Sequence, residues 1–125
     1  MYQRKLEKDI RSPLEYGLGI FGGKWDSRII CVLASQKTLR YSRLRTEMGN
    51  IINAVLASTL KNLIANDIIE RKSYDEIPTR VEYSLTEKGL SVVPILQSIC
   101  RRSGIFYKDD SENKMVQCQK CDYGK

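Results

Sequence analysis

The sequence predicts an α+β fold in which most residues are helical. Several stretches repeat apolar residues at a spacing of three and four positions, the signature of amphipathic helices. One later region alternates apolar and polar residues, which is typical of a half-buried strand. The chain has 125 residues, 42% of them hydrophobic, which suits one domain with a modest core.

The first predicted helix begins near Ser12. Ser12 can cap it, a proline follows at the first helical position, and Glu15 completes a capping box. Leu14 and Leu18 recur at helical spacing. The glycine pair at 22–23 ends the helix, and it is no phosphate loop because no strand precedes it.

Residues 24–34 form the second predicted helix, which is largely buried. Its tryptophan, Trp25, is interpreted as a core anchor rather than a stacking platform for bases, and Cys31 as a buried thiol. A short extended segment at 39–41 then leads into a third helix over residues 41–48, which a Gly-Asn pair ends.

Residues 53–65 form the fourth predicted helix, with Leu56, Leu60 and Leu63 on one face. The opposite face is small and polar, and taken alone it favours an ordinary solvated surface. Two helices joined by a short turn and followed by a hairpin, however, favour a winged helix-turn-helix domain, whose second helix meets a major groove. That opposite face consists of Ala54, Ser58, Lys61, Asn62 and Ala65.

The hairpin pairs residues 68–74 with residues 81–85, and Thr86 can cap the helix that follows. That helix is expected over residues 87–107, with a kink or a break at Pro94. Its apolar stripe is wider than packing on one side of a small domain requires, which indicates a second partner surface. The stripe consists of Val92, Val93, Ile95, Leu96, Ile99, Cys100 and Phe106.

Charge and composition restrict the classes of function that the chain can have. The net charge is +6 and the central residues 36–72 are the most basic, which indicates either a polyanionic partner or a solvated basic surface. The chain has no histidine, so catalysis by a Ser-His-Asp or Cys-His site is excluded and no enzyme is predicted. Without a membrane-length apolar run or a secretory-like start, we expect a cytoplasmic protein.

Three domain segments are expected: a basic N-terminal segment over residues 1–11, the folded domain over residues 12–107, and a polar, flexible tail over residues 108–125. The tail holds Cys118 and Cys121, whose spacing suits half a zinc site or a redox pair. Because no second ligand pair is evident, a mobile tail is favoured over a metal knuckle. We predict no metal and no cofactor, and take Cys100, Cys118 and Cys121 as the candidate redox thiols.

Several blocks together resemble the HxlR-type branch of the MarR-like winged-helix transcription regulators. They are Ser-Pro-Leu-Glu-Tyr-Gly-Leu at 12–18, Gly-Gly-Lys-Trp at 22–25, Leu-Arg-Tyr-Ser-Arg-Leu at 39–44, residues 56–69, and Pro-Thr-Arg-Val-Glu-Tyr-Ser-Leu-Thr-Glu-Lys-Gly at 78–89. The blocks span roughly residues 12–104, which is most of the chain. Two of them, Gly-Gly-Lys-Trp and Arg-Val-Glu-Tyr-Ser-Leu-Thr, are fairly specific when they occur in this order.

The resemblance implies a homodimer that binds double-stranded operator DNA and has terminal dimerisation helices. The helix over 53–65 would enter the major groove and the wing over 75–80 the minor groove. The alternative is a winged-helix protein-interaction module that binds DNA only non-specifically. The implied DNA contacts are Arg40, Arg43, Asn53, Ala54, Ser58, Lys61, Asn62, Thr79 and Arg80, and the implied dimer contacts are Leu14, Leu18, Val92, Leu96, Ile99 and Phe106.

At three positions the sequence allows an alternative to the family pattern or departs from it. Arg80 is expected to contact the minor groove, and the alternative is an ion pair with Glu82 or Asp75. Many members of the family carry a cysteine where Ser12 stands, and a hydroxyl cannot replace a thiolate at neutral pH. Redox sensing through this position is therefore not expected, while a redox or small-molecule effector that acts elsewhere is left open. Ile52 stands where the family has a polar helix cap, so a neighbouring asparagine, at 50 or 53, is expected to cap instead.

Overall fold

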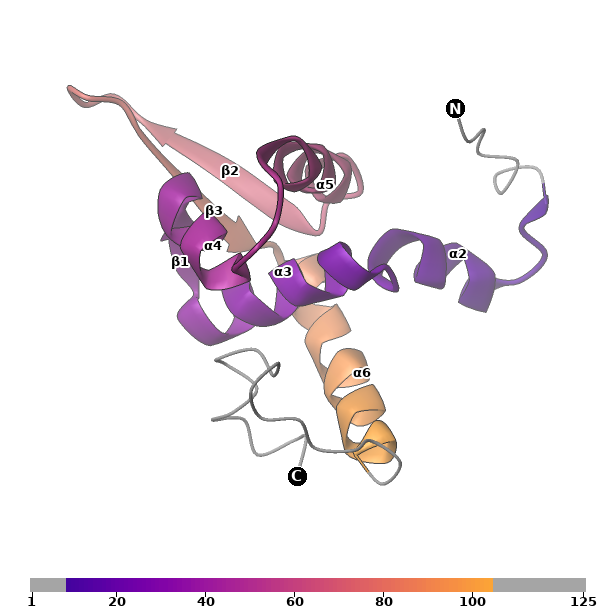
Figure 1. Ribbon diagram of the computed structural model, residues 1–125. Coiled ribbons are helices and arrows are strands. Elements are labelled where there is room, and N and C mark those ends of the chain that lie inside the picture. The colour runs from indigo at the N-terminus through magenta and orange to yellow at the C-terminus, as the bar shows by residue number, and fades with distance from the viewer. Residues whose placement is uncertain (1–8, 105–125) are drawn as a thin grey trace.

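The computed structural model describes residues 9–104, and its elements form a mostly helical α+β domain with a small sheet (Figure 1). The sheet is antiparallel, with strand order β1-β3-β2. Two consecutive helices followed by a β-hairpin give the winged helix-turn-helix arrangement, which confirms the predicted fold class. The elements are α2 (Pro13–Phe21), α3 (Lys24–Gln36), β1 (Thr38–Arg40), α4 (Tyr41–Met48), α5 (Asn53–Ala65), β2 (Ile69–Tyr74), β3 (Arg80–Leu85) and α6 (Glu87–Ser103).

The core lies between α3, α4, α5, α6 and the inner face of the sheet. The three leucines predicted to share one face of α5 are all buried. Ile29 and Ile30 of α3 are fully enclosed, and Trp25 packs against the edge of the core as predicted. Lys24 and Arg28 lie over the Trp25 ring at 4.8 and 4.9 Å from its centroid, so cations cover that ring and it offers no open platform for a base.

Two predicted helix caps are present and one is wrong. The Ser12 hydroxyl accepts from the Glu15 amide at 3.2 Å, and the Glu15 carboxylate accepts from the Arg11 amide at 2.7 Å. The Thr86 hydroxyl caps α6. At α5, by contrast, Ile52 is the N-cap and makes no side-chain hydrogen bond, so neither neighbouring asparagine caps this helix.

Helix α6 continues through Pro94 as one element, so of the kink or break expected at this residue the break does not occur. Proline removes one helical hydrogen bond, to the carbonyl of Leu90. Both residues are exposed, so water can hydrogen-bond that carbonyl.

The sheet separates an apolar from a polar face. Tyr83 is buried and lies opposite Leu39 and Arg71, whereas Glu82 lies opposite Arg40 and Lys72. Because opposed residues project to the same side of a sheet, Arg71 belongs to the face that meets the helices.

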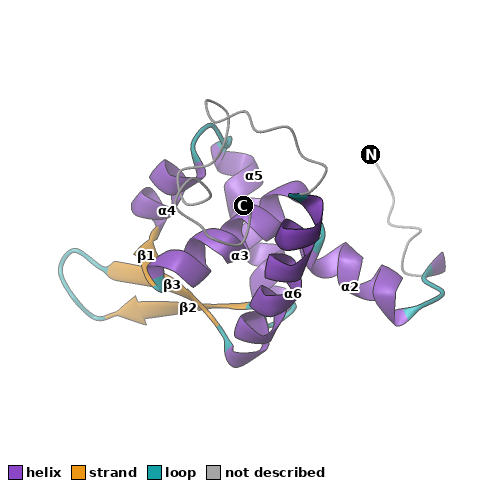
Figure 2. Ribbon diagram, turned by 90° about the horizontal axis from the view of Figure 1, so that it is seen from below, coloured by secondary structure: helices purple, strands orange, loops and turns teal. Residues whose placement is uncertain are grey.

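Helix α2 extends away from the rest of the domain, beside the start of α3 (Figures 1 and 2). None of its residues is buried, although Leu14, Tyr16 and Leu18 are large and apolar. Within residues 9–104, no helix is long and apolar enough to cross a membrane. The predicted tail over 108–125 lies outside the described residues.

Candidate nucleic-acid interface

The outward side of α5 is the first part of the candidate interface. Each residue that helical periodicity assigned to this side is exposed, and Ala57 and Asn53 are exposed beside them. Alanine and serine at this surface let the helix backbone approach a groove closely, while Lys61 and Asn62 supply a charge and an amide. The exposure of the predicted residues is confirmed, and their contact with DNA stays a prediction.

The start of α5 is tied to the start of α4. The Tyr41 hydroxyl donates to the Asn53 carbonyl across a long 3.5 Å. Inside the helix, the hydroxyl of the buried Thr59 donates to the Val55 carbonyl at 2.7 Å, so this polar side chain is satisfied without a partner from another element. The two helices of the motif are thus held by the leucine core and by this contact at the turn.

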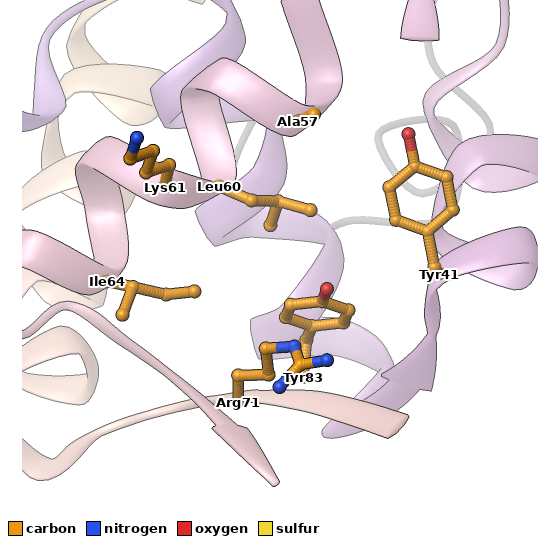
Figure 3. A pocket seen from close by; sticks show the side chains of 7 residues that line it. All are labelled: Tyr41, Ala57, Leu60, Lys61, Ile64, Arg71 and Tyr83. Carbon is orange, nitrogen blue, oxygen red and sulfur yellow. The ribbon is translucent and has the colours of Figure 1, made fainter. Parts of the chain in front are cut away.

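A hollow of about 270 Å³ lies between α5, the start of α4 and the strands β2 and β3. Figure 3 shows Tyr41 on one side of it, Lys61 and Ile64 on the other, and Arg71 with Tyr83 between them. Among the described residues, no ion pair involves Lys61 or Arg71. Two cations without an ion pair, next to the apolar side chains that line the hollow, suit the phosphate and sugar of a nucleic-acid backbone.

Arg71 was not among the residues predicted from the sequence to contact DNA. The strand alternation that placed Tyr83 on the inner face could have revealed it, because Arg71 is directly opposite Tyr83 in the register. Predicting the position of Arg71 requires the pairing register of the two strands as well as their alternation. That register depends on the length of the turn between the strands.

Arg80, the wing residue expected to contact the minor groove, is engaged within the chain. Its guanidinium forms an ion pair with Glu76 at 2.9 Å and a longer one with Glu82 at 3.8 Å. It also lies over the Tyr74 ring, 4.0 Å from the centroid. The predicted alternative, an internal ion pair, is therefore present, with Glu82 as one partner and with Glu76 in place of Asp75.

The tip of the wing is acidic and partly apolar. Asp75 and Glu76 are exposed there, Thr79 is exposed, and Ile77 is fully exposed. A net negative tip is repelled by phosphates, so any close approach of the wing to DNA depends on the cations behind the tip.

The two remaining predicted cations differ in position. Arg43, on α4, is exposed and forms only a loose pair with Glu47 at 3.7 Å. Arg40 lies opposite Glu82 on the outer face of the sheet, which is the side away from Tyr83 and the hollow. The structure therefore does not bring Arg40 together with Lys61 and Arg71.

The residues of the predicted dimer surface differ in exposure. Val92 and Leu96 are only 6% and 8% exposed because they pack into the core, so they leave little surface for a second copy. Leu14, Leu18 and Ile99 are exposed as expected. Leu90 and Ile95, which the prediction of the dimer surface omitted, are exposed on α6, and Phe106 lies outside the described residues.

The thiols give no metal site within residues 9–104, where no group of three or more potential ligands gathers. Cys31 packs against the core and Cys100 is half-buried on α6. Cys118 and Cys121 lie outside the described residues.

Fold and surface together define a winged helix-turn-helix DNA-binding protein. In agreement with this class, the model of the HxlR-like helix-turn-helix family matches residues 20–110. The chain belongs to the HxlR-like helix-turn-helix family, whose members are transcriptional regulators and not enzymes.

Related proteins support this membership. An uncharacterised HTH-type transcriptional regulator of Halalkalibacterium halodurans is 38% identical over 99 residues, covering 79% of this chain and 88% of the relative. Another, from Methanothermobacter thermautotrophicus, is 41% identical over 100 residues, covering 80% and 75%.

Solved structures agree with the fold. The reduced form of the regulator YodB from Bacillus subtilis has a TM-score of 0.71 at 30% identity and covers 81% of this chain and all of that one. The redox regulator HypR in its oxidised form has a TM-score of 0.69 at 31% identity and covers 79% and 100%.

Proposed function

We propose that this transcriptional regulator binds operator DNA as a homodimer, with α5 in the major groove and the wing over residues 75–80 at the adjacent minor groove. Such a protein acts in the cytoplasm, where the DNA is. The observation that carries the proposal is the outward side of α5, which is small and polar over its whole length and beside which the cations Lys61 and Arg71 lie.

The proposed contacts divide into two kinds. Asn53, Ala54, Ser58 and Asn62 face base edges, because they lie on the exposed side of the inserted helix. Lys61, Arg71 and Arg43 hold phosphates, which fix the position of the helix but carry no sequence information. Arg40 contributes less to phosphate binding, because it lies on the outer face of the sheet.

At the wing, Thr79 and Arg80 are the proposed contacts. Arg80 reaches the DNA by exchanging the Glu76 carboxylate for the negative potential of a narrow minor groove. The Tyr74 ring beneath it can stay in place during this exchange, since stacking leaves the guanidinium edge free to donate.

Dimerisation is supported by apolar surface that the single chain leaves uncovered. Helix α2 buries none of its own residues, and Leu14 and Leu18 are 70% and 48% exposed. On α6, Leu90, Ile95 and Ile99 are about half exposed. A helix with an uncovered apolar face needs a partner, and a second copy of the same chain provides the same two helices.

Fluorescence anisotropy with promoter DNA flanking the gene of this protein, compared with a scrambled duplex of equal length, tests the proposal. Tighter binding to the promoter DNA is expected, with affinity that falls as salt rises. Lys61→Ala should weaken binding to both duplexes by a similar factor, because a phosphate contact is not specific to sequence. Equal affinity of the parent protein for both duplexes would favour the protein-interaction module instead.

A further inference from the structure

The turn that follows the recognition helix α5 is closed by its own amides. The Ile68 amide donates to the Leu63 carbonyl at 2.9 Å and the Asp67 amide to the Ile64 carbonyl at 3.0 Å, the pattern of a Schellman motif. Asp67 takes the left-handed conformation, with φ of 61°. These bonds involve the amides of the turn. Its carbonyls accept hydrogen bonds from another part of the chain.

The donors come from the start of α6. The Lys88 ammonium donates to the Asn66 carbonyl at 3.0 Å, and the Thr86 amide donates to the Ile68 carbonyl at 3.0 Å. The Thr86 hydroxyl lies 2.5 Å from the Asp67 carbonyl. Three consecutive carbonyls at the end of α5 are thus bonded by one short segment at the beginning of α6.

Gly89 brings the two backbones into direct contact. A Cβ atom built on it would lie 2.1 Å from the Ile68 carbonyl oxygen and 3.1 Å from the Ile68 carbonyl carbon. Any side chain here would push α6 off the turn, because the obstructing atoms belong to the backbone. The glycine is required for this approach rather than for an unusual backbone angle.

These contacts exceed what starting a helix requires. Capping needs only the bond from the Gly89 amide to the Thr86 hydroxyl, at 3.0 Å. The same hydroxyl also donates to the turn, and Lys88 adds a bond that has no part in capping. The α5–α6 joint, formed by residues 66–68 and 86–89, therefore fixes the end of one helix against the start of the other.

We propose that Thr86, Lys88 and Gly89 are positioning residues that set the orientation of the recognition helix relative to α6. This inference rests on the proposed dimeric, DNA-binding function. Because α6 carries exposed apolar residues assigned to the dimer contact, the joint determines how far apart, and at what angle, the two α5 helices of a dimer lie. Its consequence is selectivity for the spacing between the two half-sites of an operator.

The experiment measures affinity for three duplexes: an operator selected by the parent protein from random DNA, the same operator with one base pair inserted between the half-sites, and a duplex with one half-site. The variants are Thr86→Val, Thr86→Ser and Lys88→Met. Ser91→Ala is the matched control, because the Ser91 hydroxyl bonds only within α6, to the Lys88 carbonyl.

In Thr86→Val, the preference for the selected over the lengthened operator should fall about fivefold, the equivalent of one ordinary hydrogen bond, with single-half-site affinity unchanged. Lys88→Met should reduce the preference about twofold because its bond is exposed. Thr86→Ser and Ser91→Ala should behave as the parent does. Folded dimers of Thr86→Val and Lys88→Met that keep the parent's preference would overturn the proposal; if Thr86→Val does not fold, Lys88→Met decides.

Hydrogen exchange separates failure of the joint from failure of the proposed function. If the joint holds the turn, Thr86→Val or Lys88→Met speeds exchange of the Asp67 and Ile68 amides, and Ser91→Ala does not. Unchanged exchange of these amides in both variants overturns the proposed role of the joint, even if DNA binding is confirmed. A parent protein without sequence preference refutes the proposed function instead, and with it the spacing role of the joint.

Discussion

Neutralising Glu76 should strengthen DNA binding, although it removes an ion pair. The carboxylate of Glu76 holds the Arg80 guanidinium at 2.9 Å. For the wing to contact DNA as proposed, this pair must open in every binding event. Glu76→Gln keeps the size of the side chain and removes the charge that competes with the DNA.

The solvent exposure of the ion pair between Arg80 and Glu76 limits how much free energy it contributes. About half of the Glu76 side chain is exposed to solvent, at 49%, so the pair contributes no more than about 1 kcal/mol to folding. The longer pair with Glu82 and the stacking on Tyr74 remain. Glu76→Gln should therefore cost less than about 1 kcal/mol of stability and raise DNA affinity by about two- to fivefold.

Anisotropy titrations at one salt concentration, with urea unfolding of the same preparations, measure both quantities. Asp75→Asn is the matched control, since it removes an equal charge from the same turn without freeing Arg80. The gain should be larger for Glu76→Gln than for Asp75→Asn, and in an Arg80→Ala background the two gains should become equal. If Glu76→Gln weakens binding, the pair orders the wing for DNA, and Glu76 does not compete with DNA for Arg80.

Three further outcomes follow from named contacts. Arg71→Ala should lower the slope of log affinity against log salt by about one, because one phosphate contact is lost, and an unchanged slope would remove Arg71 from the interface. Ile99→Glu should shift the protein to a monomer in light scattering at micromolar concentration, because a buried unpaired charge is costly; a variant that stays dimeric would exclude this part of α6 from the contact. Burial raises the pKa of Asp26 above its ordinary 3.8, so Asp26→Asn should be more stable than the parent at neutral pH, with a difference that shrinks as the pH falls through the raised pKa towards 3.8. Urea unfolding at several pH values checks this, and a difference that grows as the pH falls would contradict it.

Helix boundaries and the wing could be predicted from the sequence because local signals set them. The fourth predicted helix, over residues 53–65, has the bounds of α5. Thr86 caps α6 as its position before an apolar stripe indicated. In each case a short-range pattern, either helical periodicity or a capping side chain, was sufficient.

The division of the α6 stripe could not be predicted, because a periodic pattern does not say how many partners share it. Val92 and Leu96 face the core, while Ile95 and Ile99, on the neighbouring side of the same helix, remain exposed. That division depends on the direction in which α6 leaves the sheet, and at its start Gly89 lies directly against the Ile68 carbonyl of the turn after α5.

The partner of Arg80 depended on structure beyond its own strand. Alternation placed Arg80 and Glu82 on one face, which made that pair predictable. The shorter pair, to Glu76, arises because the turn of the wing folds back over the strand. The sequence separation of Glu76 and Arg80 gave no reason to prefer it over Asp75.

Footprinting of the protein on its selected operator, combined with the mass of the complex, tests the central claim most directly. Two protected half-sites are expected, with centres about one helical turn, or 10 base pairs, apart, in a complex that contains two chains on one duplex. A single protected segment bound by one chain, or uniform protection without sequence preference, would contradict it.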